Sequence, residues 1–134
     1  MKFESKLEKN MDYAYVRVSS ASQNIGRQLE DIKKFNVEEK NIFIDKESGK
    51  NFNRKNYKRL LRTVKENDLI IVKSIDRLGR NYKEIGEQRA YLTQRKKVNI
   101  CVIDMPILDT RKTPSDLLGK FISDLGLSQE SKKI

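Results

Sequence analysis

Short apolar runs alternate along the chain with segments in which apolar residues recur every three or four positions. Runs of four to six residues rich in valine, isoleucine and aromatic side chains predict strands. Apolar positions three or four residues apart predict helices, because they fall on one helical face. The predicted strands are 13–18, 41–45, 69–72 and 98–103, and the predicted helices lie over 25–32, 57–64, 82–95 and 117–125.

Strands that alternate with helices indicate an α/β domain. We expect three layers, with a mainly parallel sheet of four or five strands flanked by helices and joined by right-handed crossovers. A chain of 134 residues suits one such domain. Residues 1–11 form a charged leader, and no apolar run approaches the roughly 20 residues of a membrane span. We therefore expect a cytoplasmic protein with no membrane partner.

The composition removes several classes of enzyme. The chain has no histidine and one cysteine, Cys101. Ser-His-Asp and Cys-His catalysis, Cys/His zinc sites and an internal disulfide are therefore excluded. The acidic residues are dispersed rather than clustered, so we expect no metal site. Any enzyme built from this chain works with hydroxyl, ammonium, guanidinium and carboxylate groups.

The net charge of +10 is confined to the middle of the chain. Residues 46–97 hold sixteen basic and six acidic side chains, whereas the segments on either side carry no net charge. Such a segment suits a polyanion, because lysine and arginine displace counterions from nucleic-acid phosphates. A solvated, lysine-rich helix face explains the charge alone equally well.

Polar residues with a common chemistry follow three of the predicted strands. Because ligand sites in parallel sheets lie beyond the carboxyl ends of the strands, we expect these residues to converge on one edge. A hydroxyl among guanidinium groups suits attack on phosphorus, since arginine binds phosphate oxygens bidentately. No Gly-rich phosphate loop ending in Lys-Ser/Thr is present. The residues are Arg17, Ser19, Asp45, Ser48, Lys73, Asp76, Arg77 and Arg80.

Four ordered blocks carry a resemblance to a known family. They are residues 15–19 followed by Gln23 and Gln28, residues 42–49, Arg54, and residues 72–81 with the sequence Val-Lys-Ser-Ile-Asp-Arg-Leu-Gly-Arg-Asn. Together they resemble the catalytic domain of serine recombinases of the resolvase/invertase family. The resemblance runs from about residue 12 to about residue 125, so it covers most of the chain.

The resemblance implies a site-specific DNA recombinase that cuts and rejoins strands through a 5′-phosphoserine intermediate, with no cofactor, metal or small-molecule substrate. Ser19 is implied as the nucleophile. Asp76 is implied either in proton transfer or in orienting an arginine. The implied phosphate-binding arginines are Arg17, Arg77, Arg80 and, from the loop after the second strand, Arg54. The implied supporting positions are Gln23, Gln28, Asp45 and Ser48, and further candidates for DNA-phosphate contacts are Lys55, Arg59 and Lys73.

Partners and domain limits follow from the same resemblance. It implies a dimer on each DNA site and a tetramer during strand exchange. Family members continue the last helix into a DNA-binding domain, whereas here the apolar seam stops at Leu125 and Gly126 costs about 1 kcal/mol in a helix interior. We expect a catalytic domain over 12–125, a polar end at 126–134 that cuts the last helix short, and no DNA-binding domain.

Two other functions are considered. A non-catalytic remnant that acts only in DNA binding or dimerisation fits the polar end of the chain. A phosphate-binding regulatory module of the receiver type is disfavoured, because Asp12, the acid near the first strand, lies at the start of that strand.

Overall fold

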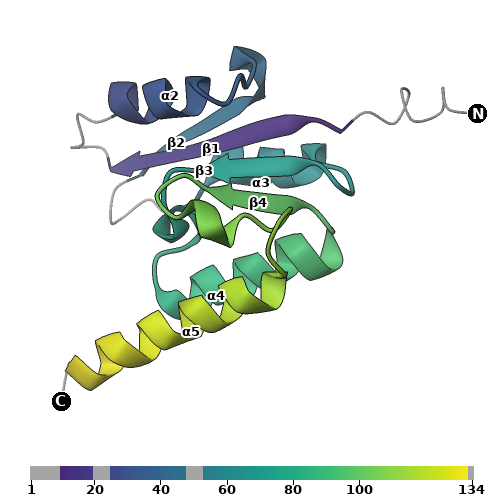
Figure 1. The fold of residues 1–134 in the computed structure, drawn as a ribbon. Helices are drawn as coiled ribbons and strands as arrows, with labels where there is room; N and C mark the ends of the chain where they lie inside the picture. The colour runs from purple at the N-terminus through teal and green to yellow at the C-terminus, as the bar shows by residue number, and fades with distance from the viewer. Residues whose placement is uncertain (1–9, 20–24, 48–52, 133–134) are drawn as a thin grey trace, which may run out of the picture.

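The computed structural model describes residues 10–19, 25–47 and 53–132. Its centre is a parallel sheet of four strands in the order β2-β1-β3-β4 (Figure 1). The strands are β1 (Asp12–Ser19), β2 (Ile42–Glu47), β3 (Leu69–Val72) and β4 (Asn99–Val102). All four strands predicted from the sequence are confirmed, with bounds that differ by no more than two residues.

Helices cover both faces of the sheet, so the expected three-layer α/β architecture is confirmed. Four α-helices are present in the described residues: α2 (Ile25–Lys33), α3 (Lys55–Thr63), α4 (Tyr82–Ala90) and α5 (Ser115–Lys132). Short 3-10 turns, η1 (Glu39–Asn41), η2 (Ile75–Leu78) and η4 (Pro106–Leu108), lie between them. In Figure 1 α2 lies apart from the other helices, and α4 and α5 run side by side.

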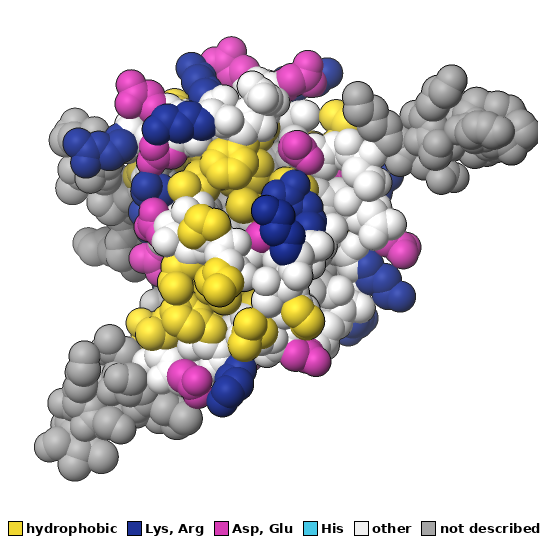
Figure 2. Space-filling model, viewed as in Figure 1, with side chains coloured by type: hydrophobic (Ala, Val, Ile, Leu, Met, Phe, Trp, Pro, Cys, Tyr) yellow, Lys and Arg dark blue, Asp and Glu magenta, His cyan; other side chains and the backbone are white. Residues whose placement is uncertain are grey.

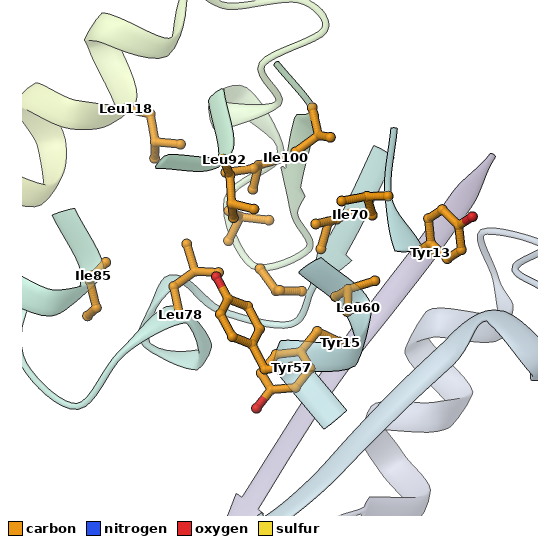
Figure 3. Packing of buried hydrophobic residues seen from close by; sticks show 14 of the residues in the cluster. Tyr13, Tyr15, Tyr57, Leu60, Ile70, Leu78, Ile85, Leu92, Ile100 and Leu118 are labelled. Atoms are coloured by element: carbon orange, nitrogen blue, oxygen red, sulfur yellow. The ribbon is translucent and has the colours of Figure 1, made fainter. Parts of the chain in front are cut away.

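Alternation along the strands sends side chains into two separate cores. Tyr15 and Ile70 belong to the larger core, which α3, α4 and α5 cover (Figure 3). Val16 and Ile71 point the other way and pack with Ile32 of α2. The smaller core also contains Cys101, which is 4% exposed, and this burial raises the pKa of its thiol. Because side chains alternate along a strand with a period of two, each strand residue meets either α2 or the helices on the opposite face.

The predicted helix over 82–95 changes its hydrogen-bond pattern before it ends. After α4, residues Tyr91–Arg95 form one π-helical turn, and Lys96 N–H donates to the Tyr91 carbonyl at 2.9 Å. Such turns insert one residue into a helix. Here the turn keeps Leu92 fully buried while the chain reverses toward β4.

The last helix continues past the glycine that was expected to weaken it. α5 extends through Gly126 to Lys132, seven residues beyond the end of the predicted apolar seam at Leu125. A Cβ atom at Gly126 would lie 3.2 Å from Cβ of Tyr82 on α4. The missing side chain therefore allows α4 and α5 to approach closely, which offsets the low helix propensity of glycine.

An apolar surface accompanies α5. Leu117 and Ile107 are 47% and 69% exposed, and Met105 and Phe121 are half-buried beside them. Figure 2 shows hydrophobic side chains gathered on the face of the molecule that carries α5 and η4. Within the described residues, no helix combines the length and the apolar character needed to span a bilayer.

Candidate active site

The carboxyl ends of β1, β2 and β3 meet at one edge of the sheet. Ser19, the last residue of β1, pairs in register with Glu47 at the end of β2, and Arg17 pairs with Asp45. β3 ends at Val72, beside Tyr15 of β1. The structure therefore brings the backbone of Ser19 and the segments that carry Asp45 and Asp76 to the same edge, as the strand pattern predicted.

Two arginines bind four consecutive carbonyl groups at the turn η2. Arg17 Nη2 donates to Asp76 O at 2.6 Å and to Gly79 O at 3.3 Å. Arg54 Nη1 donates to Leu78 O at 2.7 Å, and Arg54 Nη2 donates to Arg77 O at 3.2 Å. Carbonyls at the end of a helical turn lack helical partners and carry partial negative charge. Arg17 and Arg54 thus fix the segment on which Asp76, Arg77 and Arg80 lie.

Arg54 is held inside the protein rather than on a loop surface. It is 6% exposed, its backbone is in the left-handed region with φ 51°, and it immediately precedes α3. Its Cζ lies 3.6 Å from the ring centroid of Tyr57 and 5.5 Å from that of Tyr15. Desolvated guanidinium groups over aromatic faces are stabilised by about 2 kcal/mol. In this arrangement Arg54 holds η2 in place from inside the fold.

Asp45 holds the start of α3, and therefore holds Arg54 in place. Its carboxylate accepts hydrogen bonds from the backbone N–H groups of Asn56 at 2.9 Å and Tyr57 at 3.0 Å. It also accepts from the Tyr15 hydroxyl at 2.8 Å. An anion at a helix N-terminus satisfies unpaired N–H groups and interacts favourably with the helix dipole. Burial, together with the bond to Asp45, raises the pKa of Tyr15, so this phenol stays protonated at neutral pH.

Asp76 and Arg77 form a pair at the open side of the site. Arg77 Nη1 lies 3.0 Å from Asp76 Oδ1, and Arg77 Nε donates to Gln28 Oε1 at 3.4 Å. The Ser74 hydroxyl also donates to Asp76 Oδ1. The Asp76 side chain is 61% exposed and that of Arg77 is 23% exposed. Gln28 on α2, a predicted supporting residue, thus contacts Arg77, a predicted catalytic arginine.

Arg80 lies at the rim of the site, where α4 begins. Its side chain is 57% exposed, and its Nε is 3.9 Å from Glu84 Oε1. The same carboxylate accepts from the Arg80 backbone N–H at 2.7 Å, while Asn81 caps α4 by accepting from Glu84 N–H. These bonds fix the backbone at Arg80 and leave its guanidinium at the surface.

Of the remaining predicted residues, some lie outside the described part of the chain and others are described. Gln23, Ser48 and the side chain of Ser19 lie outside the described residues. Lys73 lies between two carboxylates, at 2.7 Å from Asp31 and 3.2 Å from Asp104, so its charge is compensated. Its predicted DNA-phosphate contact stays a prediction.

The electrostatic character of the site is cationic. Burial lowers the pKa of Arg17, and the neighbouring charges of Arg54 and Arg77 lower it further. The described residues contain no group of three or more acidic, histidine or cysteine side chains that could hold a metal ion. Guanidinium groups next to a strand-end serine are suited to bind a phosphate group and to stabilise negative charge that develops on it.

Sequence reasoning missed the two tyrosines and the carbonyl groups of the turn. Tyr57 is predicted on the apolar face of a helix, and Tyr15 is predicted in a strand and in the first block of the family resemblance, but neither is predicted to have a role at the site. The spacing of Tyr57, three residues after Arg54, offered a weak signal, because a helical start brings such positions together. Nothing in the sequence indicates that arginine would bind main-chain carbonyls.

We expect Gly79→Ala to destabilise the protein and to displace the turn that carries the arginines. A Cβ atom at this position would lie 2.8 Å from the backbone nitrogen of Ile85 and 2.9 Å from Cβ of Glu84. Such overpacking costs about 1–3 kcal/mol. Thermal unfolding followed by circular dichroism measures the loss.

The matched control is Gly26→Ala in α2. Nothing lies within 4 Å of a Cβ at Gly26, so alanine there should be neutral or stabilise by up to about 1 kcal/mol. Equal unfolding temperatures for both variants would contradict the close approach at Gly79.

Comparison with known proteins identifies a family and several relatives that are similar to this chain. The family model described as "Resolvase, N terminal domain" matches residues 13–132. The Transposon Tn501 resolvase of Pseudomonas aeruginosa is 43% identical over 81 residues, which cover 60% of this chain and 41% of that protein. The R46 site-specific recombinase of Escherichia coli is 39% identical over 69 residues, which cover 52% and 36%. The chain thus matches less than half the length of these relatives.

A solved structure has the same fold. The N-terminal catalytic domain of TP901-1 integrase superposes with a TM-score of 0.67 at 18% sequence identity, and the match covers 93% of this chain and 100% of that one. The relation between the parallel sheet and its flanking helices is therefore shared with a protein of very different sequence.

Proposed function

Because the chain belongs to the resolvase N-terminal domain family, we propose that it is the catalytic domain of a site-specific serine recombinase that cuts and rejoins DNA. The observation that carries the proposal is the meeting of the Ser19 strand end with the arginine-bearing turn η2 at one edge of the sheet. The apolar surface beside α5 supports the pairing of subunits that the family implies. A bacterial cytoplasm is the proposed place of action, because the relatives come from bacteria and the proposed substrate is DNA.

In the proposed reaction Ser19 Oγ attacks the phosphorus of a DNA phosphodiester. A Ser–O–P bond forms, the bond from phosphorus to the 3′ oxygen breaks, and the 3′ oxygen leaves as a hydroxyl after it takes up the proton that the serine loses. The number of phosphoester bonds is unchanged. Attack of a 3′-hydroxyl on the phosphoserine therefore reseals the DNA without ATP.

The arginines have two proposed tasks. Arg77 and Arg80 face the open side of the site and are proposed to contact the nonbridging phosphate oxygens, whose charge increases in the transition state. Arg17 and Arg54 are proposed to hold η2 in place, and Arg17 also adds positive charge at the strand end. The contact of Asp76 with Arg77 supports an orienting role for this carboxylate.

The test is covalent capture of DNA. We expect the chain, fused to a sequence-specific DNA-binding module and given a nicked recombination site, to yield a protein–DNA adduct that survives denaturing electrophoresis. Excess EDTA should leave the yield unchanged, because the proposed chemistry uses guanidinium groups in place of a metal. An adduct that disappears with EDTA would contradict the proposed site. Absence of any adduct would favour a module that only binds DNA or pairs with another subunit.

A further inference from the structure

The outward face of α3 carries four basic side chains: Lys55, Lys58, Arg59 and Arg62, which we call the basic face. Successive residues of an α-helix are turned by about 100°, so these four fall within an arc of about 100°. All four are exposed. Tyr57 and Leu60 point the opposite way and are buried in the larger core. The helix therefore presents one continuous cationic surface to solvent.

The charge of this face is not compensated within the described part of the chain. The segment Lys55–Thr63 contains no acidic residue, whereas each of the other three α-helices contains at least two. No carboxylate among the described residues lies within 4 Å of any of the four side chains. Arg59 is held over the ring of Phe43 at 5.4 Å and donates to Asn56 Oδ1 at 2.9 Å, so its charge also stays at the surface.

The basic face begins at the candidate active site. α3 starts directly after Arg54, which binds the carbonyls of η2, and the helix then runs away from that edge of the sheet. From Lys55 to Arg62 the helix rises by about 10 Å. One strand of B-DNA presents about three phosphates over that length.

Resting on the proposed function, we propose that the basic face of α3 is a second contact with the DNA backbone, which binds duplex next to the phosphate that is cut. Lysine and arginine on phosphates fix position and add affinity without reading bases. A protein partner fits less well, because stable protein interfaces have an apolar centre. The large hydrophobic side chains exposed among the described residues, Met11, Tyr91, Ile107 and Leu117, all lie outside α3.

The test is the salt dependence of DNA binding by the chain itself. Binding of the chain to a fluorescent duplex of about 30 base pairs is followed by anisotropy between 50 and 200 mM salt, the range in which phosphate contacts control affinity. The variant combines Lys55→Gln, Lys58→Gln and Arg62→Gln, which keep good helix formers in α3. We expect the slope of log affinity against log salt to fall by about two to three, and the affinity at low salt to fall at least tenfold.

The control removes the same charge elsewhere. Lys33→Gln, Lys83→Gln and Lys112→Gln change exposed lysines on α2, α4 and the segment before α5. This control should keep the slope of the unmodified chain. Equal losses in the two triple variants would mean that only net charge matters, and would overturn the proposal. An unchanged slope in the α3 variant would also overturn it and would favour an acidic protein surface as the partner.

The proposal and the proposed function fail in different ways. Ser19→Ala should leave the salt slope unchanged, since it removes no positive charge. A slope that depends on α3 in a protein that forms no adduct would support the basic face and contradict the recombinase chemistry. Normal adduct formation, together with a salt slope that the α3 substitutions leave unchanged, would support the recombinase chemistry and contradict the role of the basic face.

Discussion

Replacing Ser19 by alanine is expected to lower the rate of covalent attachment to DNA by about 10⁴-fold or more, because the variant has no atom that can form the bond to phosphorus. The side chains that hold η2, those of Arg17 and Arg54, are unchanged, so the fold and the salt-dependent affinity for DNA should be kept. The measurement is the yield of adduct on a nicked site over time.

A second serine supplies the control for this variant. Ser123 lies on the exposed side of α5, far along the chain from the strand ends, and Ser123→Ala should form the adduct at the normal rate. If Ser19→Ala still formed a denaturation-resistant adduct, the nucleophile would be a different residue. The reading of the strand-end serine would then be wrong, although the fold and the family would stand.

Replacing Arg77 by alanine is expected to slow adduct formation by about 10²- to 10³-fold, the usual loss when one positioned donor to a transition state is removed. Two contacts orient this guanidinium, one with Asp76 and one with Gln28. Lysine has no planar fork and cannot reproduce both contacts, so Arg77→Lys should recover little of the rate. Single-turnover kinetics at saturating protein measures the effect.

The distinguishing quantity for Arg77 is the ratio between lost rate and lost affinity. A residue that acts on the transition state lowers the rate far more than the binding of DNA. Arg95→Ala, on the π turn at the opposite edge of the sheet, removes the same charge and should leave the rate unchanged. An equal loss of affinity and rate in Arg77→Ala would make Arg77 a ground-state DNA contact.

Local patterns were sufficient to predict most of the fold. Strand 69–72 is fully buried and has no polar position, and its bounds were predicted to the residue. The continuation of α5 through Gly126 was not predictable in the same way, because helix propensity does not include the helix that packs against this glycine. Its contact with Tyr82 joins residues 44 positions apart, and no local pattern contains that information.

The residues that meet at the candidate site were more predictable from the sequence than the role of each one. The ends of parallel strands gather at one edge in any such sheet, which is why Arg17, Asp45 and Asp76 could be placed together in advance. The burial of Arg54 was not predictable, because a charged side chain is normally expected at the surface. Its position depends on the ring of Tyr57 and on carbonyl groups of η2, which lie more than twenty residues away in sequence.

The single thiol provides a probe of local opening in this protein. Cys101 lies on β4 and is buried in the smaller core, so a thiol reagent reaches it only while this part of the core is open. The labelling rate under native conditions therefore reports the free energy of this opening, independently of global unfolding.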